Sequence, residues 1–237
     1  MSYLIIVFLL GLLILAHEAG HLFAAKLVKI PIARFSIGMG PGLFKWKKGD
    51  VEYMISWIPF GGYVLPAIED ESEFFNIPVG RRIIFSLGGP IANFIFCIIL
   101  FGMFNLLNNG FSFFGITFQP FIQTGSALVE LLMMIPKMFG QPDQLTGIVG
   151  IVAIGGQYTG LSLIKLINFS IMLNLNLAIF NLLPFPPLDG GKIVLSLLEK
   201  INIKSKKLFY ATSAAGAILL ITLLVYATYQ DICRLMA

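Results

Sequence analysis

The sequence is short of charge. Only 12% of its 237 residues are Asp, Glu, Lys or Arg, while 57% are apolar and the mean hydropathy is +0.89. A soluble domain usually carries about 25% charged residues, so this chain has too few to cover a surface that faces water. Intrinsic disorder is excluded as well, because disordered segments are poor in apolar residues. The composition indicates an integral membrane protein.

Cysteine is nearly absent. Cys97 and Cys233 each lie in an apolar run without C-x-x-C spacing. We therefore expect both to be buried as small apolar side chains, with no disulfide and no metal between them. The net charge of +4 does not indicate nucleic acid as a partner, because the basic residues flank the apolar runs. The partner that this arrangement predicts is the lipid bilayer.

Four apolar runs are long enough to cross a bilayer, which takes about 20 residues in a helix. We therefore predict an α-helical integral membrane protein with about four transmembrane helices. The first run contains ionisable residues, which a signal peptide would lack, so we expect it to be a retained span. The predicted spans are residues 3–25, 83–107, 161–183 and 208–229.

Lysine and arginine are distributed unevenly among the loops. Thirteen lie between the first and second or between the third and fourth predicted spans, against two in the remaining loop and the C-terminal tail. Loops rich in Lys and Arg stay on the cytoplasmic side of a membrane. We therefore expect both Lys-rich loops to face the cytoplasm and both termini to face outside.

Two further segments do not span. The segment Gly49–Leu65 alternates like a strand and breaks near Pro59, which predicts a β-hairpin over 49–65. The segment Gly125–Gly140 has an apolar helical pattern interrupted by Pro136, and we expect it at the outer membrane interface. Because there is no internal repeat, we predict a single domain over residues 1–237.

The two histidines of the chain belong to one motif, His17-Glu18-Ala19-Gly20-His21. Positions i and i+4 share a face of a helix, so both imidazoles can reach one ion. This is the H-E-x-x-H pattern, in which zinc activates a water molecule and the glutamate acts as general base. Ionisable groups in a spanning helix are costly and are usually functional, which makes a chance cluster of packed polar residues a poor alternative.

Catalytic zinc usually has three protein ligands, so the motif lacks one. No histidine remains, and the third ligand must be a carboxylate at membrane depth. Asp189 follows the third predicted span in Pro184-Phe185-Pro186-Pro187-Leu188-Asp189-Gly190-Gly191 and fits this role. The alternative is that Asp189 only caps the helix that begins near Gly190.

With these motifs in hand, the chain resembles the site-2 protease family of intramembrane zinc metalloproteases, and most of all its bacterial regulator-of-sigma-E branch. The similar segments occur in the order of the family and cover most of the chain. They are HEAGH at 17–21, FSIGMGP at 35–41, EYMISWIPFGGYV at 52–64, GGPIANF at 88–94 and NLAIFNLLPFPPLDGG at 176–191.

The resemblance implies that His17, His21 and Asp189 bind one Zn²⁺ per chain and that Glu18 is the catalytic base. It also implies that the hairpin and the end of the third span receive an extended substrate. For Asn93 it suggests a place in or beside the site, with helix packing as an equal alternative. The residues expected to bind substrate are Asn181, Pro184, Tyr53, Ile55, Gly61 and Gly62; for Asn181 a helix–helix hydrogen bond is the alternative.

The sequence departs from the branch in two places. Members usually carry one or two PDZ domains between the second and third spans, whereas only about fifty residues separate Leu107 from Leu161 here. A PDZ domain needs about twice that length, so we predict that it is absent. The stretch Thr146–Ile151 also lacks the Gly-Pro that the family tends to have there.

We therefore predict an intramembrane zinc metalloendopeptidase that cleaves within or near the transmembrane segments of single-span proteins. Expected substrates are anti-sigma factors or signal-peptide remnants, with a protease that cuts first as a further partner. The expected location is a bacterial-type inner membrane, with the catalytic side facing the cytoplasm. Two alternatives stay open. One is a transporter, which would show paired halves; the other is an inactive homologue that acts as a binding module.

Overall fold

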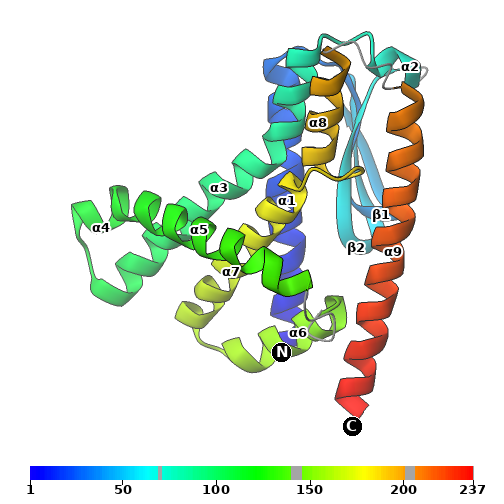
Figure 1. The fold of residues 1–237 in the computed structure, drawn as a ribbon. Coiled ribbons are helices and arrows are strands. Elements are labelled where there is room, and N and C mark those ends of the chain that lie inside the picture. Colours follow the sequence, from blue (N-terminus) through cyan, green and yellow to red (C-terminus); the bar gives the residue numbers. More distant parts are fainter. Residues whose placement is uncertain (69–70, 140–145, 201–205, 237) are drawn as a thin grey trace. The chain divides into compact units, whose positions relative to one another are not determined.

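The computed structural model describes residues 1–68, 71–139, 146–200 and 206–236 (Figure 1). Two long strands follow the first helix, and the rest of the described chain is mostly helical. The strands are β1 (Ile32–Lys48) and β2 (Val51–Pro66). The helices are α1 (Ser2–Leu27), α2 (Glu71–Phe74), α3 (Val79–Asn109), α4 (Phe113–Thr117), α5 (Gln119–Phe139), α6 (Ile148–Thr159), α7 (Leu163–Leu182), α8 (Asp189–Lys200) and α9 (Lys206–Met236).

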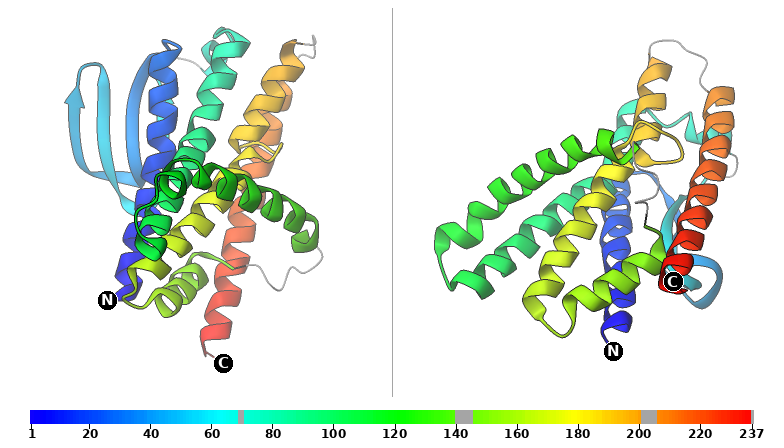
Figure 2. Two further views of the ribbon diagram at one scale, coloured as in Figure 1. Left: turned by 90° about the vertical axis from the view of Figure 1, so that its left-hand side faces the viewer. Right: turned by 60° about the horizontal axis from the view of Figure 1, so that its bottom comes forward.

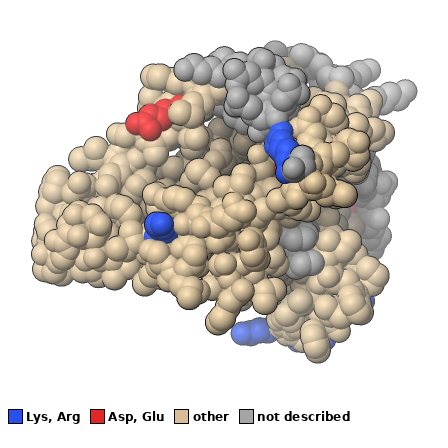
Figure 3. Space-filling model, turned by 90° about the horizontal axis from the view of Figure 1, so that it is seen from below, with Lys and Arg blue, Asp and Glu red and all other residues tan. Residues whose placement is uncertain are grey.

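Four of these helices are long and apolar enough to cross a membrane. They are Ser2–Leu27, Val79–Asn109, Leu163–Leu182 and the part Ala211–Met236 of α9. Figure 3 shows a face of the molecule on which charged side chains are sparse. The predicted fold class, four spanning helices with a β-hairpin between the first two, is confirmed.

The described chain divides into two compact units. We call residues 1–9, 94–179 and 217–237 the helical unit, and residues 10–93 and 180–216 the hairpin unit. Each of the four long apolar helices contributes residues to both units. The hairpin unit contains all the residues that the sequence predicts to carry chemistry.

In the hairpin unit, α1 and α3 approach closely because small residues face each other. A Cβ added to Gly20 would lie 2.5 Å from Cβ of Ala92, and one added to Gly88 would lie 2.6 Å from Cβ of Ala24. Small residues four apart are the usual means by which two helices in a membrane bring their backbones together. This packing holds the histidine motif of α1 against α3.

Helix α8 is fixed to α3 by a buried guanidinium. Arg82 is 2% exposed, and its Nη2 donates to a carboxylate oxygen of Glu199 at 2.6 Å, while its Nε donates to the carbonyl of Ile77. Its charge also lies 5.7 Å and 5.4 Å from the rings of Phe74 and Phe75. Because a buried charge is tolerated only when it is paired, this contact holds the C-terminal end of α8 against α3.

The hairpin is paired more extensively than two strands in simple register. Tyr53 pairs with both Phe35 and Trp46, and Ile55 likewise has two partners in β1. Segment 62–66 of β2 pairs with β1 along one side only, among the residues that the structure describes. This segment runs beside α1 (Figure 2).

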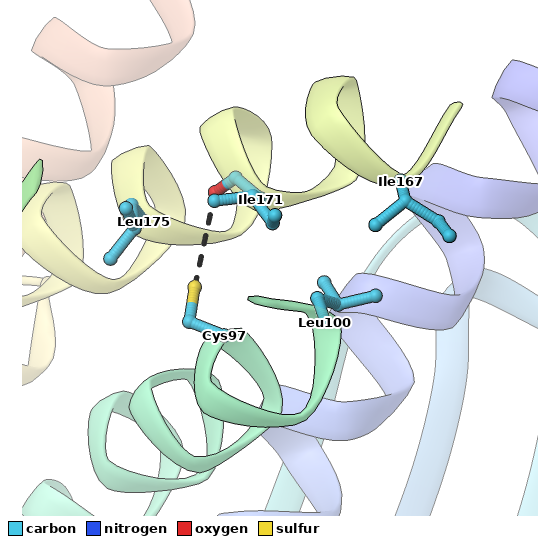
Figure 4. Packing of buried hydrophobic residues seen from close by; sticks show 5 residues of the cluster. All are labelled: Cys97, Leu100, Ile167, Ile171 and Leu175. Atoms are coloured by element: carbon cyan, nitrogen blue, oxygen red, sulfur yellow. Dashed lines mark hydrogen bonds between the residues drawn. The ribbon is translucent and has the colours of Figure 1, made fainter. Parts of the chain in front are cut away.

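The core of the helical unit joins α3 to α7. Cys97 is fully buried, and its thiol faces the carbonyl of Ile171 at 3.9 Å (Figure 4). The cluster consists of Cys97, Leu100, Ile167, Ile171 and Leu175. The predicted burial of Cys97 is confirmed. The same prediction is wrong for Cys233, which is a free and exposed thiol, because it lies on an outward-facing side of α9.

Between α3 and α7 the described residues form α4, α5 and α6 and no β-strand, which agrees with the predicted absence of a PDZ domain. The predicted interfacial segment 125–140 lies within α5 up to Phe139, and residue 140 is outside the described residues. The position of α5 at the interface stays a prediction. The sequence analysis did not predict α6, a short apolar helix of 12 residues.

Candidate metal centre

The structure brings together the three predicted metal ligands. His17 and His21 lie one turn apart on α1, and Asp189 is the first residue of α8. Their Nε2 atoms are 3.2 Å apart, and Oδ2 of Asp189 lies 3.2 Å from Nε2 of His17 and 3.1 Å from Nε2 of His21. All three residues are buried. The predicted convergence of the histidine motif and the third carboxylate is therefore found.

The donor set and its spacing fit zinc. Two imidazoles and a carboxylate are common zinc ligands, with bonds of about 2.0–2.1 Å and tetrahedral geometry. The ligand atoms of such a site lie about 3.3 Å from one another. The three separations of 3.1–3.2 Å thus match one face of a zinc tetrahedron.

Each ligand has a partner on its far side. Nδ1–H of His21 donates to the carbonyl of Phe85 at 2.8 Å, which leaves the lone pair of Nε2 pointing to the centre. The amide of Asn93 lies 3.1 Å from Nδ1 of His17. The ammonium of Lys192 donates to Oδ1 of Asp189 at 3.0 Å, so that Oδ2 faces the two histidines. Such outer partners orient metal ligands.

The environment keeps Asp189 ionised. Burial by itself would raise the pKa of this carboxyl, but the charge of Lys192 and the close imidazoles of His17 and His21 outweigh it and hold the pKa well below its usual range. A carboxyl group must be deprotonated to bind a metal ion. Asp189 therefore has the protonation state of a ligand at neutral pH.

The metal centre opens into a cavity of about 190 Å³. Glu18 lines this cavity next to the two histidines, and Asn181 and Lys192 face it from the end of α7 and from α8. Residues 62–64 of β2 line it as well. A larger hollow of about 430 Å³ lies against Lys45 and Trp46 of the hairpin, but no histidine or cysteine lines it. The smaller cavity is the one lined by the residues that the sequence predicts to be catalytic.

Two glycines make room for this arrangement. A Cβ on Gly89 would lie 2.5 Å from Nε2 of both His17 and His21, in the space that these nitrogens share. A Cβ on Gly62 would lie 2.7 Å from Cγ of Glu18. Only a residue without a side chain fits at either position, which keeps the centre of the site open.

The residues predicted to bind substrate are placed differently from one another. Asn181 and Gly62 line the cavity. Gly61 directly precedes Gly62 in the chain, and its φ of 86° is a backbone conformation that favours glycine. Pro184 is exposed and is not among the residues that line the cavity. Tyr53 and Ile55 lie in a segment whose backbone is paired on both sides.

Sequence reasoning did not assign roles to Phe85, Gly89 or Lys192. Phe85 acts through its backbone carbonyl, for which no side-chain pattern gives a signal. Gly89 lies in the GGPIANF motif, four residues before Asn93. That spacing places both residues on one face of a helix and could have indicated that Gly89 lies near the site. Lys192 follows Asp189 by three residues, which places both on one side of α8.

Comparison with known proteins gives consistent results. The sequence model of peptidase family M50 matches residues 5–224. A protein of Fusobacterium nucleatum named "Putative zinc metalloprotease FN1322" is 24% identical, over an alignment that covers 99% of each chain. The regulator of sigma-E protease RseP of Escherichia coli is 40% identical over 102 residues, which is 38% of this chain and 22% of that protein. A protein of Chlamydia trachomatis named "Putative zinc metalloprotease" is 43% identical over 111 residues, which is 40% of this chain and 18% of that protein.

Proposed function

We propose that this chain, which belongs to peptidase family M50, cleaves peptide bonds within or near the transmembrane segments of single-span membrane proteins. Family membership and the four apolar helices make it a membrane metalloprotease. The observation that carries the proposal is a single cavity lined by the three metal ligands, by Glu18 and by a β-segment paired along one side only.

The residues that line the cavity would have different roles in peptide hydrolysis. His17, His21 and Asp189 would hold the zinc ion, which supplies Lewis acidity to a water molecule and to the scissile carbonyl. Glu18 lines the same cavity and takes a proton from the attacking water. A C–O bond forms, the C–N bond breaks, and Glu18 returns the proton to the departing amine.

A substrate span must unwind before it can react, because a helix hides each carbonyl in its own hydrogen bonds. Segment 62–66 supports this step, since one side of it has no partner strand among the described residues. An unwound peptide added along this side would gain backbone hydrogen bonds next to Glu18. The structure favours residues 62–64 for this role over Tyr53 and Ile55, whose pairing is complete on both sides.

Asn181 is the group proposed to bind the other edge of the substrate backbone. Its side chain lines the cavity at the end of α7, and an amide offers both a donor and an acceptor. Because segment 62–66 and Asn181 would both contact the substrate backbone, we expect little selection among substrate side chains. Selection would depend on how readily the substrate helix unwinds, since Gly and Pro lower helix stability by about 1 and 3 kcal/mol relative to Ala.

We propose an orientation in a bacterial inner membrane with both termini outside and the catalytic side facing the cytoplasm. The uneven distribution of Lys and Arg supports it. A cysteine introduced at Lys47 should be labelled from the cytoplasmic side, and one at Asn109 from the outside, in a chain whose Cys97 and Cys233 are replaced by alanine. Labelling of position 47 from the outside contradicts the orientation.

Co-expression with single-span proteins tests the function. The panel should contain full-length and truncated anti-sigma factors and signal-peptide remnants, so that it also shows whether an earlier cut is needed. We expect cleavage of at least one class by the parent chain. Glu18→Gln should abolish it, while Glu130→Gln, which alters an exposed acid on α5, should have no effect.

Two results would refute the proposed protease activity. One is the absence of cleavage throughout the panel by a parent chain that binds zinc. The other is equal cleavage by the parent and by Glu18→Gln. A chain that transports metal ions or binds substrates without cutting them would give the first result.

A further inference from the structure

One face of α3 contacts the metal centre at three successive turns. Residues 85, 89 and 93 are spaced by four, so they share that face. The carbonyl of Phe85 accepts from His21, and Gly89 leaves space beside the Nε2 atoms of both histidines. Asn93, which is 0% exposed, places its side-chain amide nitrogen 3.1 Å from Nδ1 of His17. Asn93 is thus the third contact of this face.

The chemistry of histidine decides what His17 needs from this neighbour. A histidine that binds a metal ion through Nε2 must leave that nitrogen unprotonated, so the proton of the neutral ring lies on Nδ1. In a buried site this N–H needs an acceptor. A half-turn of the Asn93 amide about its Cβ–Cγ bond exchanges its nitrogen and oxygen with little change of shape.

We propose that Asn93 is a positioning residue of the metal centre. Its amide oxygen accepts the Nδ1 proton of His17 when Nε2 binds the metal ion, and its amide nitrogen donates to Nδ1 when no ion is bound. The inference rests on the proposed zinc chemistry but not on the cleavage of any substrate. Helix packing alone, the other role considered for Asn93, would require no hydrogen-bonding group at this position.

Zinc affinity of the purified full-length chain, measured by competition with a chromophoric chelator, tests the proposal. Asn93→Leu keeps the volume and removes the hydrogen bond, and we expect a loss of about 10–100-fold in affinity, the usual effect of removing an outer partner. Asn93→Asp keeps an acceptor at the same place and should restore the affinity to within a few-fold of the parent.

Asn174→Leu is the matched control. Asn174 is also 0% exposed in a helix, and its amide donates to the thiol of Cys97 at 3.1 Å in the helical unit. This variant should bind zinc as the parent does. The visible spectrum of the Co²⁺-loaded protein gives a second measurement, because it responds to ligand geometry and should change in Asn93→Leu but not in Asn174→Leu.

The outcomes separate this inference from the proposed function. If Asn93→Leu binds zinc as tightly as the parent, or Asn93→Asp no more tightly than Asn93→Leu, Asn93 has no positioning role, even in a chain that cleaves substrate. If zinc affinity depends on Asn93 as expected but no substrate is cut, the proposed protease activity is refuted and the positioning role of Asn93 stands. Circular dichroism identifies a variant that does not fold, and Asn93→Ala then replaces Asn93→Leu in the comparison with Asn93→Asp.

Discussion

Each unit of the molecule buries an aspartate, and the two carboxylates have different surroundings. Asp189 in the hairpin unit faces two imidazoles and an ammonium group, all on side chains. Asp231 in the helical unit accepts the backbone N–H of Gly150, near the start of α6, at 2.7 Å and pairs with the guanidinium of Arg234 at 3.9 Å, with no imidazole or second carboxylate recorded beside it among the described residues. Burial of a carboxylate therefore does not identify a metal site. Convergence with other side chains that can bind a metal does.

Three other buried polar groups of the helical unit also bond to the backbone, as Asp231 does. The hydroxyls of Thr159 and Ser170 each donate to the carbonyl four residues earlier, both at 2.7 Å, and Asn105 donates to the carbonyl of Gly115 at 2.7 Å. These bonds satisfy one polar group with a nearby backbone group. They stabilise helices and their connections and leave no group directed to a shared centre.

The largest effect should come from the carboxylates themselves. Asp189→Ala removes a ligand, so zinc affinity should fall by more than about 100-fold, beyond the usual cost of losing an outer partner. Asp231→Ala should leave zinc affinity unchanged. Chelator competition on both purified variants makes the measurement. Retention of zinc by Asp189→Ala would show that the third ligand lies elsewhere.

A methyl group placed at the centre of the site should have the next largest effect. The Cβ of Gly89→Ala would lie 2.5 Å from both Nε2 atoms, so the imidazoles must move apart, and we expect zinc affinity to fall by about 10–100-fold. Gly80→Ala is the control, since nothing lies within 4 Å of its added Cβ on the same helix. Equal zinc affinities of the two variants would mean that the rings adjust without cost.

Removal of the structural aspartate should affect folding instead. Asp231→Ala leaves the N–H of Gly150 without its acceptor, and the cost of an unsatisfied buried donor is about 1–3 kcal/mol. We expect a lower free energy of unfolding in detergent with unchanged zinc stoichiometry. Asp231→Asn, which keeps an acceptor oxygen, should lose less. A variant of normal stability would indicate that water replaces the carboxylate.

The spans and the common face of the two histidines were predictable because they depend on local sequence. Apolar runs of sufficient length predict four spanning helices, and the spacing of His17 and His21 fixes their common face whatever surrounds them. Asp189 was predicted as the third ligand because the sequence offers no other suitable residue. These predictions required only helix geometry and the coordination number of zinc.

The remaining parts depend on contacts between distant segments. No pattern in the sequence shows that the carbonyl of Phe85 faces His21, since every residue has a carbonyl. The exposure of Cys233 depends on which side of α9 finds a neighbour, and the double pairing of Tyr53 depends on how β1 folds back. Such features are decided by packing, and hydropathy alone does not encode them.

A final comparison involves one lysine from each unit. The ammonium of Lys192 pairs with Asp189 and lines the catalytic cavity, whereas that of Lys165 lies 5.8 Å from the ring centroid of Tyr158. A cation beside the attacked carbonyl stabilises the negative charge that develops on its oxygen. A fully buried donor of this kind contributes about 10²–10³-fold to the rate. The side chain of Lys192 is 35% exposed, so water screens part of its charge.

We therefore expect Lys192→Met to lower the cleavage rate by about tenfold, less than the loss of a buried donor. Zinc affinity should fall as well, by about tenfold, because Lys192 orients Asp189 through Oδ1 and helps to keep it ionised, so the rates are compared at saturating zinc. Initial rates on a cleaved single-span protein should show a lower kcat with little change in KM, and Lys165→Met should behave as the parent. If both lysine variants cleave at equal rates, the ammonium of Lys192 serves Asp189 alone and takes no part in the reaction.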